Sequence, residues 1–138
     1  MQENKQAMPF AKSLISVTLT VILASITHAY EFGYRAFVAV VIVVALLYAL
    51  NILYRRTKNK ASLVFYGLLN AWIIIGFGLI NGFWNHTFKA FLSYLHGGYL
   101  PPFLAGLFMK PQIGSFLYEG IGTLTFVSSV FAAYMDLN

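Results

Sequence analysis

The sequence predicts an all-α integral membrane protein in which four transmembrane helices form a bundle. Apolar residues make up 59% of the 138 residues and charged residues only 9%, whereas roughly a quarter of a soluble protein is charged. The mean hydropathy is +0.74. The apolar residues also gather into four runs, each close to the roughly 20 residues that cross a bilayer as a helix. Most of the surface is therefore expected to face lipid.

The four runs are expected to be helices because lipid offers the backbone no hydrogen-bond partner outside the segment itself. They cover about residues 13–30, 34–54, 62–84 and 115–135 of a single transmembrane domain that spans residues 1–138. The first run has an alternative interpretation as a secretory signal peptide. Lys5 and Lys12 precede it, and Thr27-His28-Ala29 loosely resembles a cleavage site. The length of the run and its polar face favour a retained helix.

The basic residues predict the orientation of the bundle. Most of them lie on one side: Lys5, Lys12, Arg55, Arg56, Lys58 and Lys60. The opposite side carries Arg35, Lys89 and Lys110. Because cytoplasmic loops carry an excess of Lys and Arg, both termini and the 55–60 loop are expected in the cytoplasm, with the chain in a prokaryotic plasma membrane. Topology also explains the net charge of +5, so no nucleic-acid partner is expected.

Three of the helices carry a stripe of small and polar residues at helical spacing. The stripes are Ser13, Ser16, Thr20, Ala24 and Thr27 on the first helix, Gly67, Asn70, Ala71, Gly78, Asn81, Gly82 and Asn85 on the third, and Ser115, Glu119, Gly122, Ser129 and Ala133 on the fourth. Such residues let membrane helices approach closely, so helix packing is the first interpretation. A polar path beside Asn70, Asn81, Thr20 and Ser129 is the alternative, because polar groups are expensive in lipid. The aliphatic second helix is expected to be the most lipid-exposed.

Residues 85–114 form an apolar segment that is too interrupted for a fifth span. Gly97-Gly98 and Pro101-Pro102 break it. We expect a short interfacial or re-entrant helix over residues 86–95, a Gly-Gly turn, and a second short helix near residues 102–109. This segment would cap the outer end of the bundle.

Histidine and acidic residues gather at the predicted outer end: His28, Glu31, His86, His96 and Glu119. His28 and Glu31 lie three positions apart, so both can reach one point beside a helix. Imidazole and carboxylate groups are ligands of transition metals. The sequence therefore predicts a site for zinc, iron or copper, or for haem. Two alternatives are a proton-titrating role for one histidine with Glu119, and an ion pair of Glu119 with Arg35, Lys89 or Lys110.

Other chemistry has little support. The chain has no cysteine, which excludes disulfides and thiolate chemistry. It has no H-E-x-x-H, no G-x-S-x-G and no phosphate-binding glycine loop. Three functions stay open. The first is a membrane-embedded metal or redox site, or an enzyme acting on a lipid-soluble substrate. The second is a small oligomeric transporter or ion channel that uses Glu119 and the polar stripes. The third is an accessory subunit of a larger membrane complex. Membrane lipids are the expected partners in all three cases, with further copies of the chain or a larger membrane complex.

Overall fold

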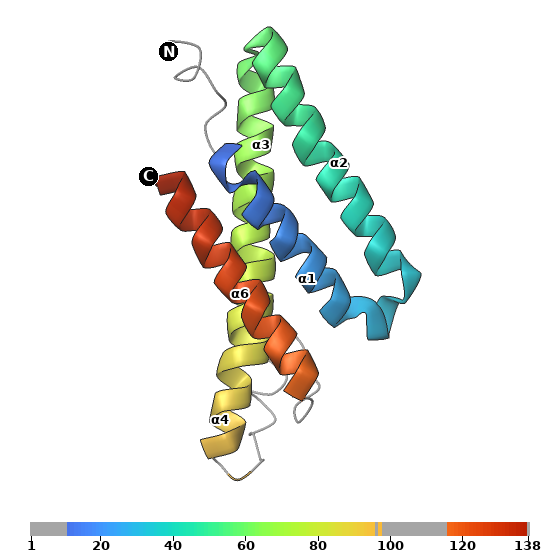
Figure 1. The fold of residues 1–138 in the computed structure, drawn as a ribbon, viewed down its shortest axis with the longest axis vertical. Coiled ribbons are helices and arrows are strands. Elements are labelled where there is room, and N and C mark those ends of the chain that lie inside the picture. The colour runs from blue at the N-terminus through green and yellow to red at the C-terminus, as the bar shows by residue number, and fades with distance from the viewer. Residues whose placement is uncertain (1–10, 96, 98–115, 138) are drawn as a thin grey trace.

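The computed structural model describes residues 11–95, 97 and 116–137, and no strand occurs among them. A short 3₁₀ turn, η2 (Ala11–Ser13), leads into the helices. These are α1 (Leu14–Phe32), α2 (Tyr34–Thr57), α3 (Lys60–Trp72), η3 (Ile73–Phe88), α4 (Lys89–Leu95) and α6 (Phe116–Leu137). All four predicted runs are therefore helical. Figure 1 shows that α1, α2, the α3–α4 rod and α6 alternate in direction.

Three helices are long and apolar enough to cross a membrane: Tyr34–Thr57, Lys60–Leu92 and Glu119–Leu137. The first helix contributes a shorter apolar stretch, Leu14–Ala29. The ends of α1, α2 and α6 lie within a few residues of the ends predicted from the apolar runs.

The third helix is longer than the sequence pattern predicts. Helices α3, η3 and α4 follow one another without a break from Lys60 to Leu95, so the prediction of a separate interfacial helix over residues 86–95 is wrong. The reason is local, because residues 85–95 contain neither glycine nor proline to stop the helix. The expected glycine turn follows at Gly97, where φ is +68°. The second predicted helix, near residues 102–109, lies outside the described residues.

Element η3 is a π-helix, in which hydrogen bonds run between residues five apart; the N–H of Lys89, for example, donates to the carbonyl of Trp84. This wide turn brings residues four apart close to one face. Two neighbouring rows of residues at four-residue spacing are therefore buried. One row is Gly78, Gly82, His86 and Ala90, and the other is Asn81, Asn85 and Lys89. Long π-helices are rare, and shorter ones recur at functional sites.

The two turns that hold α2 have clear sequence causes. Gly33 joins α1 to α2 at φ +57°, a left-handed value that glycine adopts without a steric penalty. At the other end Lys58 also has a left-handed φ, and its N–H donates to the carbonyl of Tyr54. The Oδ1 atom of Asn59 then caps α3 by accepting from the N–H of Ala61 at 2.8 Å. Both turns keep α2 beside its sequence neighbours α1 and α3.

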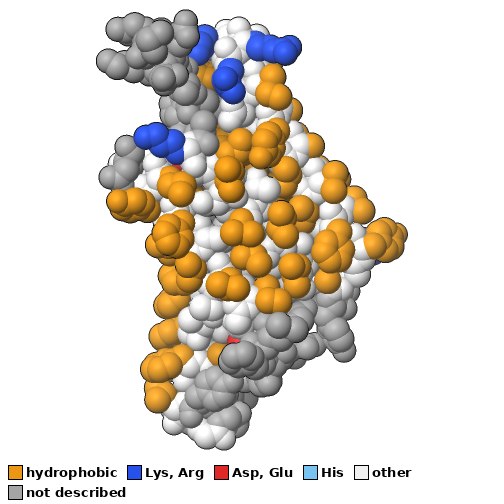
Figure 2. Space-filling model, viewed as in Figure 1, with side chains coloured by type: hydrophobic (Ala, Val, Ile, Leu, Met, Phe, Trp, Pro, Cys, Tyr) orange, Lys and Arg blue, Asp and Glu red, His pale blue; other side chains and the backbone are white. Residues whose placement is uncertain are grey.

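The interior of the described bundle is more polar than its surface. The buried polar residues outnumber the buried apolar ones, and the exterior carries large apolar side chains such as Val41, Phe65 and Leu68. Figure 2 shows hydrophobic side chains over the middle of one face, with Lys and Arg gathered toward the end where α2 meets α3. On α2 only Ala36, Leu47 and Asn51 are buried, so the prediction of an exposed second helix is confirmed. This arrangement suits a lipid solvent.

Candidate functional site: a buried polar seam

Helix α6 crosses η3 so closely that glycine is required on both sides. A Cβ atom added to Gly82 would lie 2.7 Å from the backbone nitrogen of Phe126 and 2.9 Å from the carbonyl oxygen of Gly122. A Cβ on Gly122 would overlap the ring of His86, and one on Gly78 would overlap the side chain of Ser129. The predicted stripes on the third and fourth helices therefore meet as packing faces.

Hydrogen bonds between side chains join α6 to its neighbours at several levels. Near the end of α6, the Nδ2 of Asn70 donates to the Oδ2 of Asp136 at 2.6 Å. Deeper in the bundle the hydroxyls of Thr20 and Ser128 lie 2.7 Å apart, which connects α1 to α6. At the opposite end the hydroxyls of Thr87 and Thr123 lie 2.9 Å apart. These contacts follow the antiparallel register that the glycines set.

We call the buried polar residues along this interface the polar seam. Its members are Thr20, Asn70, Asn81, Asn85, His86, Lys89, Glu119, Thr125, Ser128, Ser129 and the adjoining Asp136. The four residues predicted to line a polar path, Thr20, Asn70, Asn81 and Ser129, are all buried in it. Polar groups thus follow α6 from Glu119 in its first turn to Asp136 near its end.

Two asparagines in the middle of the seam have no hydrogen-bond partner among the described residues. Asn81 is 3% exposed and Asn85 is 1% exposed. For both side chains, the oxygen and the nitrogen of the amide lack a partner within the part of the chain that the structure describes. A buried amide in that state costs on the order of 2–7 kcal/mol in an apolar setting. These positions therefore call for a hydrogen-bonding occupant such as water.

Ionisable side chains gather at the end of the seam away from the α2–α3 turn. His86 and Glu119 are buried, and Lys89 is fully buried. The ring of His86 lies within electrostatic reach of His28, Glu119 and Lys89. The register explains the grouping: Gly122 faces His86, so Glu119, three residues before it on α6, lies at the level of Lys89, three residues after His86. We call His28, His86, Lys89 and Glu119 the ionisable cluster.

Of the five predicted metal ligands, His28 and Glu119 each lie within electrostatic reach of His86, and the side chains of the other two are outside what the structure describes. Glu31 is in the last turn of α1, but its side chain is not among the described ones, and His96 lies outside the described residues. No group of three His, Cys, Asp or Glu side chains that could hold a metal ion occurs among the described residues. The metal site therefore stays a prediction.

The sequence indicates Lys89 only as a basic residue of the outer segment and as one possible ion-pair partner of Glu119, so its burial beside the polar seam is not predicted. A signal for it exists in the sequence. Asn81, Asn85 and Lys89 recur at four-residue spacing, and Gly78, Gly82 and His86 recur beside them. A lysine that continues a row of buried polar residues is expected to face the interior of the bundle.

Searches for similar proteins add no assignment to this geometry: no protein family, no curated protein and no solved structure matches the chain.

Proposed function

We propose that this protein spans a cell membrane with four helices and conducts protons along the polar seam. The observation that carries the proposal is the pair of buried amides at Asn81 and Asn85 without partners among the described residues. In a membrane such groups are retained where they line water or a transported species, because packing alone is served better by small or apolar residues. Water held at these amides would connect the two ends of the seam.

Titratable groups stand at both ends of this path, which favours protons over other ions. Glu119 and His86 lie at one end and Asp136 at the other. Between them are hydroxyls, such as those of Thr20 and Ser128, that both donate and accept hydrogen bonds. Chains of carboxyl and imidazole groups serve as proton relays in membrane pumps and transporters.

In the proposed topology α1 crosses the membrane in addition to the three longer spans. Both termini lie in the cytoplasm, and the membrane is a prokaryotic plasma membrane. The start of α1, the end of α6 and the α2–α3 turn lie toward one end of the molecule in Figure 1. The exposed basic residues Arg55, Arg56, Lys58 and Lys60 are at that end. The excess of positive charge favours the cytoplasm for it. Oligomerisation would widen a path that one short chain leaves narrow.

Proton flux into vesicles tests the proposal. Purified protein is reconstituted with a pH-sensitive dye inside, and a potassium gradient with valinomycin supplies the driving potential. We expect proton uptake well above that of protein-free vesicles. Glu119→Gln keeps the size of the side chain but removes its titration, so uptake should fall at least tenfold. Asp136→Asn should do the same from the other end of the seam.

Arg56→Gln is the matched control, because it removes an exposed charge near the end of α2, far from the seam. Its uptake should equal that of the unaltered protein. Circular dichroism and gel filtration establish that each variant folds. Uptake that is unchanged in folded Glu119→Gln and Asp136→Asn would overturn the proposal. Uptake no greater than in protein-free vesicles, with the chain recovered in a larger complex, would instead favour an accessory subunit.

A transition-metal site at the ionisable cluster is the second candidate, favoured by the approach of His28 and Glu119 to His86. Glu31 and His96 would complete the ligand set. Elemental analysis for zinc, iron and copper, with an absorption scan for haem, distinguishes the two candidates on the same samples. One metal ion per chain that is lost in His86→Ala supports the metal site, while metal-free protein that conducts protons excludes it.

A further inference from the structure

A cavity of about 340 Å³ lies between α1, α2 and Phe77 of η3, and His28 of the ionisable cluster lines one end of it. Its volume falls in the range of small-molecule sites. The wall is made by small side chains, among them Ala24, Ala36 and Ala39, which leave the space open between the two helices. Because α2 contacts chiefly α1 and α3, no further helix of the described bundle fills this space.

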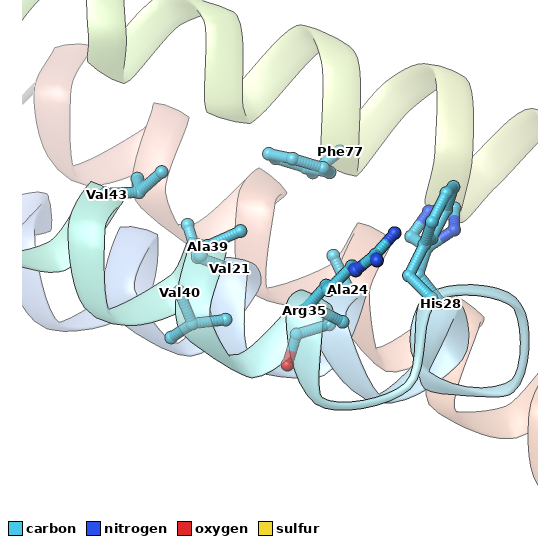
Figure 3. Close-up of a pocket in the computed structure, with 11 residues that line it drawn as sticks. Val21, Ala24, His28, Arg35, Ala39, Val40, Val43 and Phe77 are labelled. Atoms are coloured by element: carbon cyan, nitrogen blue, oxygen red, sulfur yellow. The ribbon is translucent and has the colours of Figure 1, made fainter.

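The cavity is polar at one end and apolar along the rest of its length. In Figure 3 the side chain of Arg35 extends toward the ring of His28 at one end, and Val40 and Val43 line the other. Arg35 is one residue into α2 and Val43 is eight residues further on, so the apolar part extends about 12 Å along the helix. Figure 3 also shows the ring of Phe77 over the middle of the space.

We propose that this cavity binds one anionic phospholipid, with its phosphate at Arg35 and His28 and one acyl chain along Val40 and Val43. Guanidinium groups hold phosphate oxygens by charge-assisted hydrogen bonds. A cation at the membrane boundary above an apolar cleft matches the order of headgroup and chain in a lipid. The inference goes beyond proton conduction and does not depend on it.

A neighbouring groove without a charged residue serves as a comparison for the headgroup selectivity of the cavity. It has a volume of about 440 Å³ and also lies between α1 and α2, where Thr18, Ile22 and Val44 line it. No charged side chain lines this second groove, so acyl chains of any lipid can cover it. Of these two sites, only the cavity at Arg35 is therefore expected to select lipids with an anionic headgroup.

Binding is measured with the full chain in a neutral detergent. Phosphatidylglycerol is titrated against it and followed by native mass spectrometry and thermal stability, with phosphatidylcholine and oleic acid as comparison ligands. We expect one phosphatidylglycerol per chain at saturation, with at least fivefold weaker binding of phosphatidylcholine. Arg35→Gln should abolish that preference, and Ala39→Trp should block the cavity and weaken binding of phosphatidylglycerol at least tenfold.

Each variant has a matched control on the same helix. Arg56→Gln removes a charge at the far end of α2, and Ala49→Trp adds the same bulk at an exposed position outside the cavity; both should bind as the unaltered protein does. A phosphatidylglycerol with a diazirine in its acyl chain should crosslink to α1 and α2 around the cavity. Equal binding of the two phospholipids, preference for oleic acid, or phosphatidylglycerol binding unchanged in both Arg35→Gln and Ala39→Trp would overturn the proposal.

Discussion

Glycine residues decide how closely the helices around the polar seam approach. Gly82 and Gly122 face each other across the contact between η3 and α6, where a side chain on either would meet backbone or ring atoms. Gly120, two residues before Gly122, is exposed, and a Cβ there meets nothing within 4 Å. The same residue type therefore has a packing role at one position of α6 and none two positions earlier.

This contrast predicts opposite effects of one substitution at two sites. Gly82→Ala should lower the free energy of unfolding by about 1–3 kcal/mol, because the backbone of Phe126 must move to admit the methyl group. Gly120→Ala should be neutral or stabilise by up to about 1 kcal/mol, because alanine favours the helix and has room. Denaturant titration in mixed micelles measures both. A Gly82→Ala variant as stable as the unaltered protein would contradict the close crossing.

At this scale the sequence indicated part of the site. The spacing of Asn70, Asn81 and Gly82 predicted which side of the third helix is buried. It also placed His28, His86 and Glu119 at the same end of the molecule, where the structure has them. The sequence pattern did not predict the burial of Lys89, because a basic residue after an apolar run is typical of a membrane boundary.

Among the elements, α6 holds the bundle together because it shares side-chain hydrogen bonds with both α1 and the α3–η3 rod. In lipid there is no hydrophobic force between helices, so such bonds and close packing must hold them. The bond between Thr20 and Ser128 joins α1, the helix with the shortest apolar stretch, to this centre.

A double-mutant cycle on this pair should reveal a coupling of about 0.6 kcal/mol, the average for hydrogen bonds within membrane helices. The variants are Thr20→Val, Ser128→Ala and their combination, and the measurement is the free energy of unfolding. Thr18→Val supplies the control, since the hydroxyl of Thr18 donates within α1 to the carbonyl of Leu14 at 2.7 Å. Its combination with Ser128→Ala should be additive, and additivity of the Thr20 pair as well would argue against the contact.

The extent of the elements was predicted well where an apolar run marks it and poorly where hydrogen-bond geometry determines it. Apolar runs mark α1, α2 and α6 to within a few residues. The π-helical form of η3 was missed, because nothing in its residue types distinguishes bonds to the fifth residue from bonds to the fourth. The third stripe also fails at Ala71, which lies in α3 ahead of the π-helix and is exposed.

The whole molecule has two chemically different ends, and this property predicts its orientation. Because the chain has no cysteine, single cysteines can report on each end. We expect Tyr34→Cys, beside the Gly33 turn, to react with a membrane-impermeant maleimide on intact cells. Lys58→Cys should react only after permeabilisation, since the basic residues at its end predict a cytoplasmic location. The reverse labelling pattern would invert the topology, and equal labelling of both sites would argue against the alternating passes.

The sequence predicts the order and the alternating direction of the helices, but not which helices contact one another. The order of α1, α2, the α3–α4 rod and α6, each reversing the direction of the one before, follows from four apolar runs, two short turns and one longer connection. The contact of α6 with both α1 and η3, with α2 to the side, does not follow from the apolar runs. It depends on matching surfaces between helices distant in the chain, such as Gly82 against Phe126.

The unequal lengths of the helices have a consequence for the surrounding bilayer. The apolar stretch Leu14–Ala29 of α1 is too short to cover about 30 Å of hydrocarbon, while the rod Lys60–Leu92 exceeds it. In the proposed four-span topology the rod would tilt, and the bilayer beside α1 would thin to match the shorter helix. Lipids with shorter tails should then reduce the mismatch at α1 and increase it at the rod, and lipids with longer tails should do the reverse.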